Sequence, residues 1–298
     1  VMVRPARFAF NEETAGNNFF QQAGEADPAV ADDVAERALR EFDGMVALLR
    51  RNDVDVVVVQ DTAEPKTPDS IFPNNWFSSH ITGELVLYPM FAENRQLERK
   101  REVLDLLRRR MNHRKVVDLT GWEEKGEFLE GTGSMVLDRR RSIAYCCRSP
   151  RTSERVLADF CSRMNYDPVV FDAVDAEGRP LYHTNILMEI GTQVAVICLE
   201  SIQDEGQRKR VADELTSAGK VLVEITMDQL SQFTGNMLEV RGRNGHPFMV
   251  MSAAARAALT PEQERTISTF NRILSSDLET IETHGGGSAR CMMAEIFH

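Results

Sequence analysis

Apolar runs separated by short turns recur along this chain and predict one structural unit several times over. The pattern is clearest in the middle of the chain, where Gly191 and Thr192 separate two apolar runs and give a hairpin-turn signal. Apolar residues at helical spacing, Val211 and Leu215, follow the hairpin. This unit has predicted strands over 184–189, 193–200 and 220–225 and a predicted helix over 207–218.

The same order of strand, turn, strand, helix and strand can be traced in the rest of the chain. The other complete units have predicted strands over 76–79, 84–88 and 115–119, over 134–138, 142–147 and 168–171, and over 237–241, 247–252 and 278–282. Their predicted helices are 93–111, 152–164 and, in the last unit, helical segments between 253 and 274. The two ends supply a fifth unit, with strands over 2–8, 54–59 and 289–297 and an amphipathic helix over 28–51. Shared between the termini, this unit would close a ring without a free sheet edge.

Polar residues able to do chemistry recur in register with these units. They are spaced 53 to 55 residues apart, and they are Asn75, Glu130, His183, Asn236 and Cys291. A fixed period is the mark of a repeat architecture. We therefore predict an α/β fold with five pseudo-symmetric blades in one domain over residues 1–298, with the five register residues meeting near its axis.

Composition narrows the classes of function. The chain has 298 residues, 42% of them hydrophobic, but it has no apolar run of the roughly 18 residues that a membrane span requires. Its net charge of −11 argues against nucleic acid, because the arginine clusters at 108–110 and 139–141 are short and scattered. We expect a soluble protein with a small-molecule substrate, and we leave self-association into a homo-oligomer open.

The cysteines and histidines give no sign of a disulfide framework or a metal site. The five cysteines are odd in number and lack CxxC spacing, which is typical of a reducing compartment. None of the six histidines has a partner at H-x-x-H or H-x-x-x-H spacing, so we expect neither a metal nor another cofactor. Since no signal-peptide pattern is seen at Val1, we expect a cytoplasmic protein.

Cys291 is the candidate nucleophile, because it follows the glycine-rich stretch 284–290. Consecutive glycines let backbone N–H groups approach developing negative charge. A thiol nucleophile needs a proton shuttle and a carboxylate to orient its partners, and His183 and Glu130 share its register. His284 is a rival base outside that register. The alternative interpretations are a buried core cysteine, a structural histidine and a turn glutamate.

Set in this five-fold array, the chain resembles the guanidino-group-modifying superfamily, whose five-bladed α/β propeller is called the pentein fold. The resemblance covers the whole chain and rests on three motifs, which are Leu129-Glu-Gly131, His183-Thr-Asn185 and the glycine-rich approach 285–291. It implies a covalent cysteine mechanism with Cys291, His183 and Glu130 as catalytic residues.

Within this superfamily, the segments 4–5, 11–14, 18–21 and 286–297 look like the amidinotransferase-like hydrolases linked to citrulline use. Two positions depart from the arginine-deiminase pattern, because Asn75 and Asn185 stand where aspartates would grip a guanidinium. A carboxamide offers one acceptor and one donor and carries no charge. The double change favours a neutral ureido substrate such as citrulline, which would give ornithine.

The resemblance also implies which residues hold the amino-acid end of the substrate. Asp69 would bind the ammonium, Arg95 and Arg151 the carboxylate, and Asn74 would lie beside the stem, with Arg148 as an alternative to Arg151. Other functions remain open, namely an arginine deiminase, a dimethylarginine-type hydrolase, an amidinotransferase and a pentein that only binds ligand. The sequence offers no role for Asn236 beyond a turn.

Overall fold

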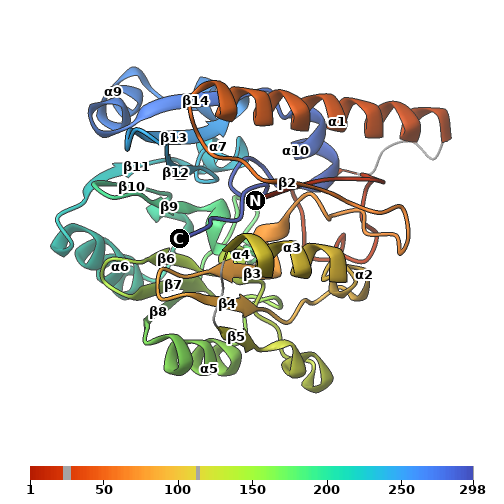
Figure 1. Ribbon diagram of the computed structural model, residues 1–298. Coiled ribbons are helices and arrows are strands. Elements are labelled where there is room, and N and C mark those ends of the chain that lie inside the picture. The colour runs from red at the N-terminus through yellow and green to blue at the C-terminus, as the bar shows by residue number, and fades with distance from the viewer. Residues whose placement is uncertain (23–27, 112–114, 298) are drawn as a thin grey trace.

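Small mixed sheets surround a common centre, with helices on the outside (Figure 1). The computed structural model describes residues 1–22, 28–111 and 115–297. Within these residues, four sheets have three strands and a fifth has two. In each three-stranded sheet the middle strand pairs antiparallel with the strand before it and parallel with the strand after it. The parallel pair is the one joined by a helical crossover, as a parallel connection requires.

The elements follow the predicted order in each complete unit. The first unit has β3 (Phe77–Ser79), β4 (Glu84–Leu87), α2 (Glu93–Gln96), α3 (Arg101–Met111) and β5 (Lys115–Asp118). The second has β6 (Val136–Asp138), β7 (Ile143–Cys147), α5 (Glu154–Met164) and β8 (Asp167–Phe171), and the third has β9 (Met188–Ile190), β10 (Val194–Ile197), α6 (Glu205–Ser217) and β11 (Val221–Glu224). The fourth has β12 (Leu238–Arg241), β13 (Pro247–Ser252), α8 (Ala253–Ala258), α9 (Pro261–Phe270) and β14 (Arg272–Ser276). The predicted strand-strand-helix-strand repeat is confirmed.

The fourth unit differs from the prediction at its end. Its closing strand is β14, and the predicted strand over 278–282 is instead part of helix α10 (Glu279–Gly285). A short apolar run does not by itself distinguish a strand from a buried helix turn. The helical segments predicted between 253 and 274 are α8 and α9, which are separate because Thr260 begins a new helix with a capping box and Pro261 occupies its first turn.

The fifth unit is formed by both termini, but it has fewer strands than predicted. β1 (Met2–Arg4) pairs in parallel with β2 (Val58–Gln60), and α1 (Pro28–Arg51) lies between them in the chain. The predicted strand over 289–297 is wrong, because backbone N–H groups there close turns, including Cys291 to the Ser288 carbonyl. Val1 and Ala294 exchange backbone hydrogen bonds, so this segment still lies beside β1.

The core lies between the sheets and the outer helices. Strand β10 is buried on both faces, which explains its continuous apolar sequence. Helix α1 buries residues at helical spacing, Ala38, Phe42, Met45 and Leu49, and it contacts α10 and β14. No helix in the described residues is long and apolar enough to cross a membrane.

Candidate active site

The fold brings the register residues together from separate units. Asn75 ends the 3-10 helix η1 (Pro73–Asn75), Glu130 immediately precedes α4 (Gly131–Ser134), and His183 immediately precedes the 3-10 helix η3 (Thr184–Ile186). Asn236 comes shortly before β12, and Cys291 follows α10. All five side chains are buried, and α4 contacts both η1 and η3. Asn75, Glu130 and His183, from three separate units, therefore lie close together in the interior.

Two side-chain amides surround the sulfur of Cys291. The Nδ2 of Asn185 lies 3.4 Å from Sγ, and the Nδ2 of Asn236 lies 3.3 Å from it. Asn236 contacts the candidate nucleophile, although the sequence suggested no role for it. Its place in the 53- to 55-residue register was the available signal.

The glycine-rich approach to Cys291 is packed against the N-terminal segment. Gly286 has a φ of +62°, and a Cβ there would lie 2.5 Å from Oδ1 of Asn18. Its carbonyl accepts a hydrogen bond from the Tyr182 hydroxyl. The positive φ and the close contact together require glycine at this position.

His183 and Glu130 form a buried pair, with 2.8 Å between Nε2 and Oε2. Burial lowers the pKa of His183 to about 4, although the hydrogen bond to the Glu130 carboxylate acts to raise it. Burial alone would raise the pKa of Glu130, but Arg151, His183 and Arg95 outweigh it and hold this pKa below its usual range. Near neutral pH, therefore, a neutral imidazole donates Nε2–H to a carboxylate and keeps a lone pair on Nδ1.

Arg151 contacts the same carboxylate oxygen, Oε2 of Glu130, as His183 does. Its Nη1 lies 3.5 Å from Oε2 of Glu130, its Nε donates to Asn17, and its guanidinium lies over the Tyr182 ring. Arg148, the alternative considered from the sequence, instead pairs with Glu154 and Asp172 and is 40% exposed. Of the two arginines, only Arg151 contacts Glu130 in the described structure.

The amide of Asn75 is oriented by Arg95. Arg95 donates from Nη1 to Oδ1 of Asn75 at 2.8 Å and makes two hydrogen bonds to Glu98. This leaves Nδ2 of Asn75 buried without a hydrogen-bond partner in the described residues. Gly133 makes room for it, because a Cβ there would lie 2.8 Å from His183 and closer still to Asn75. In this arrangement Arg95 supports Asn75, and its role on a substrate carboxylate stays a prediction.

The predicted amino-acid-binding residues also present unpaired polar atoms. Asp69 accepts from Asn11 through Oδ2, while Oδ1 has no hydrogen-bond partner in the described residues. Burial raises the pKa of Asp69, and Arg95 opposes that change. Asn74 donates to Thr132, and its Oδ1 also lacks a partner among the described residues. A buried polar atom without a partner is costly, so these atoms can take a hydrogen bond from a ligand or a water.

The other candidates lie outside this cluster. His284 hydrogen-bonds the backbone carbonyl of Gln22 near the surface, and no contact joins it to Cys291 in the described structure. The other four cysteines, Cys146, Cys147, Cys161 and Cys198, are buried and unpaired. Among the described residues, no group of three or more histidine, cysteine, aspartate or glutamate side chains could hold a metal ion.

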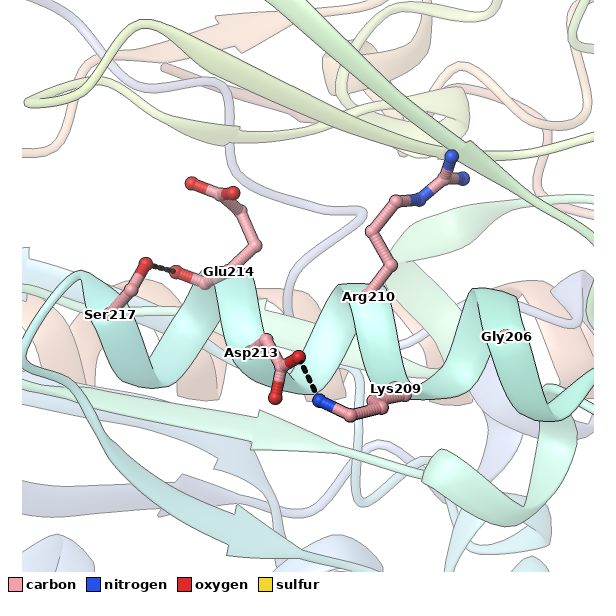
Figure 2. Close-up of a pocket in the computed structure, with 6 residues that line it drawn as sticks. All are labelled: Gly206, Lys209, Arg210, Asp213, Glu214 and Ser217. Carbon is pink, nitrogen blue, oxygen red and sulfur yellow. Dashed lines mark hydrogen bonds and ion pairs between the residues drawn. The ribbon is translucent and has the colours of Figure 1, made fainter.

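Two hollows elsewhere in the protein do not include the register residues. A shallow one lies over α6, where Lys209 pairs with Asp213 and Ser217 donates to the Glu214 carbonyl (Figure 2). A larger cavity of about 910 Å³ is lined largely by the hairpin turns of the four complete units and the C-terminal segment. Near this cavity, Glu295 pairs with both Arg139 and Arg290, and Arg290 is the residue before Cys291.

Comparison with solved structures shows the same fold. The chain matches ArgZ, an arginine dihydrolase from the ornithine-ammonia cycle in cyanobacteria, with 15% identity and a TM-score of 0.74, covering 100% of this chain and 40% of that chain. It matches AgrE in complex with ornithine and NAD⁺ with 16% identity and a TM-score of 0.74, covering 100% and 39%. It matches dimethylarginine dimethylaminohydrolase with 14% identity and a TM-score of 0.63, covering 98% and 96%.

The chain therefore spans less than half of the full ArgZ and AgrE chains, although it covers 95% of an isolated N-terminal domain of ArgZ. These matches confirm the pentein propeller. No curated protein matches this chain. The family model described as "N,N dimethylarginine dimethylhydrolase, eukaryotic" matches residues 4–298. The chain belongs to this family of cysteine-dependent C–N hydrolases in the guanidino-group-modifying superfamily.

Proposed function

We propose that this protein hydrolyses the ureido group of citrulline or a close relative and releases ammonia, carbon dioxide and ornithine. The observation that carries the proposal is the buried Nδ2 of Asn75, which has no partner in the described structure and whose orientation is set by Arg95. A free N–H donor at this point is complementary to the carbonyl oxygen of a urea. A guanidinium has only donors there.

The charges near the reacting centre support the same substrate. Glu130 is already neutralised by Arg151 and hydrogen-bonded to His183. Amides at Asn75 and Asn185 add no negative charge. A guanidinium buried here would lack the carboxylates that pair with it, and an unpaired buried charge costs about 3–5 kcal/mol. The free Oδ1 of Asn185 can instead accept from a ureido N–H.

In the proposed reaction, Sγ of Cys291 attacks the ureido carbon. As Sγ attacks, His183 takes the thiol proton of Cys291 on Nδ1. The bond from carbon to the terminal nitrogen breaks, and His183 passes this proton to the nitrogen, which leaves as ammonia. A thiocarbamate then links the ornithine side chain to Cys291. Water that gives its proton to His183 attacks the same carbon, the C–S bond breaks, and the free thiol returns with a carbamate as product. The carbamate separates into an amine and carbon dioxide.

The amino-acid end of the substrate would lie against Asp69 and Arg151. The free Oδ1 of Asp69 suits an ammonium, and Arg151 offers a planar donor group for a carboxylate. Asn11 and Asn17 currently bond these two groups. A substrate carboxylate on Arg151 would therefore compete with Asn17, whereas an ammonium on Oδ1 of Asp69 would leave the Asn11 contact to Oδ2 in place.

A second candidate is hydrolysis of arginine or a methylated arginine. The family model and the names of the structural neighbours favour it, since both refer to guanidino substrates. The two candidates are chemically close. An enzyme that hydrolyses a guanidino carbon twice meets a ureido group in the second step.

The test incubates the protein separately with citrulline, arginine, agmatine and methylarginine and measures ammonia and the amine product. We expect ornithine and ammonia from citrulline, and no turnover by Cys291→Ser at unchanged helical content. Faster turnover of arginine would favour the second candidate. Transfer to an amine without ammonia would indicate an amidinotransferase, and a thermal shift with citrulline but no product would indicate a binding protein.

A further inference from the structure

We propose that Asn236 is a positioning residue that donates an N–H to the sulfur of Cys291 and favours its reactive thiolate form. This inference rests on the nucleophilic role proposed above for Cys291. Asn236 is fully buried, and its Nδ2 lies 3.3 Å from Sγ.

The backbone around Asn236 fixes which end of its amide faces the sulfur. The backbone N–H of Arg290 donates to Oδ1 of Asn236 at 3.0 Å, and a donor can bond only the oxygen end of an amide. At the other end, Nδ2 donates to the Asn185 carbonyl at 2.9 Å. One N–H of the NH₂ group therefore bonds a carbonyl, and the other is left for Cys291.

This geometry has different consequences for the thiol and for the thiolate. A thiolate is a charged acceptor, and a hydrogen bond to a charged group is roughly twice as strong as a neutral one. Asn236 and Asn185 present two such donors, at 3.3 and 3.4 Å. As a donor, the S–H of the protonated thiol has one acceptor among the described residues, Oδ1 of Asn236, at the long distance of 3.8 Å. The amide pair consequently favours the charged nucleophile.

A purely structural role for Asn236 makes a different prediction. In that case Asn236 would serve only to hold the loop before Cys291, by accepting from Arg290 and donating to the Asn185 carbonyl. The variant Asn236→Asp keeps an acceptor for Arg290 at nearly the same shape, but it places an oxygen where the NH₂ group faces the sulfur. The carboxylate removes the donors to the Asn185 carbonyl and to the sulfur, and it repels a thiolate. Loss of the bond to Asn185 alone would not move the pH midpoint of Cys291 alkylation, so this midpoint separates the two roles.

The experiment measures the rate at which iodoacetamide alkylates Cys291, by peptide mass mapping between about pH 6 and pH 9.5. The other thiols should stay largely protonated in this range. Burial raises the pKa of Cys147 to about 12 and the pKa values of Cys161 and Cys198 to about 11. The assay needs no substrate, so it does not depend on whether citrulline is turned over.

We expect the pH midpoint of alkylation to rise by about one unit or more in Asn236→Asp, with roughly tenfold slower alkylation below the midpoint. Asn244→Asp, in the exposed hairpin of the same unit, should match the wild type. If Asn236→Asp does not fold, as judged by circular dichroism, Asn236→Ala provides the test and should also raise the midpoint.

An unchanged midpoint in a folded Asn236 variant would overturn the inference, even if the wild type hydrolyses citrulline. A raised midpoint would support it even if citrulline proves not to be the substrate. The two proposals can therefore fail separately.

Discussion

Replacing Asn75 with aspartate should shift the enzyme from a neutral toward a cationic substrate. In the structure Oδ1 of Asn75 accepts from Arg95 at 2.8 Å, and Nδ2 has no partner among the described residues. Asn75→Asp keeps an oxygen for Arg95 and turns the free donor into a charged acceptor. The side chains have nearly the same volume, so the space beside Gly133 is unaffected.

The magnitude follows from the hydrogen bonds exchanged. Citrulline would lose a buried donor to its carbonyl oxygen and face a carboxylate instead, a loss of about 2–3 kcal/mol or about 30- to 150-fold in kcat/KM. Arginine would gain a charge-assisted hydrogen bond of about 1.5–3 kcal/mol, worth at least about tenfold. The ratio of the two kcat/KM values should therefore change by about 300-fold or more.

The assay measures ornithine and ammonia from citrulline, and citrulline, ornithine and ammonia from arginine, over a range of substrate concentrations. Asn244→Asp adds the same charge in an exposed turn and serves as the control for net charge. Thermal unfolding of both variants checks that the fold is intact. Asn75→Asp with an unchanged ratio of kcat/KM values would refute the argument that the Asn75 amide selects a neutral group.

Three further predictions concern packing, pH and anchoring. Gly133→Ala should reduce kcat by about 100-fold, because the added Cβ would lie 2.8 Å from the His183 ring and small displacements of reacting groups are costly. The control, Gly121→Ala, should leave kcat unchanged in the same assay, because a Cβ there would have nothing within 4 Å. The acid limb of the kcat/KM profile should have its midpoint near pH 4, because burial lowers the pKa of His183 to about 4, and a midpoint near 6.5 would contradict this environment. The lowered pKa of His183 should also make the free energy of unfolding, measured with urea, depend on pH. It should be highest above about pH 6.5 and fall as the pH drops toward 4, because the unfolded chain takes up the proton first. Arg151→Lys should lower kcat/KM by roughly 10- to 150-fold, because lysine lacks the planar donor group. Arg148→Lys should leave kcat/KM unchanged, because Arg148 is 40% exposed and lies in a surface ion pair. Equal effects of the two substitutions would contradict the assignment of Arg151 to the substrate carboxylate.

The repeat predicted much of the fold, because its strands, helices and polar residues recur in the sequence at a fixed period. The spacing of the register residues predicted two meetings between separate units that the structure shows, Glu130 with His183 and Asn236 with Cys291. The helix α10 was not predictable, because the short run over 278–282 fits a strand or a helix turn equally well.

Long-range contacts made by ordinary polar residues could not be predicted either. Arg95 was expected on a substrate carboxylate, but in the structure it orients the Asn75 amide and pairs with Glu98. Asn236 looked like a turn residue until the fold placed it beside Cys291. Periodicity shows which residues share a centre, but not which atoms they present there.

The most direct test of the central claim supplies citrulline and arginine together, at equal concentration, and follows both by NMR with carbon-13 at the ureido and guanidino carbons. If the amides of the site select an uncharged group, citrulline is consumed first, giving labelled carbon dioxide and ornithine, while arginine persists. Consumption of arginine ahead of citrulline, or accumulation of citrulline, would contradict the account.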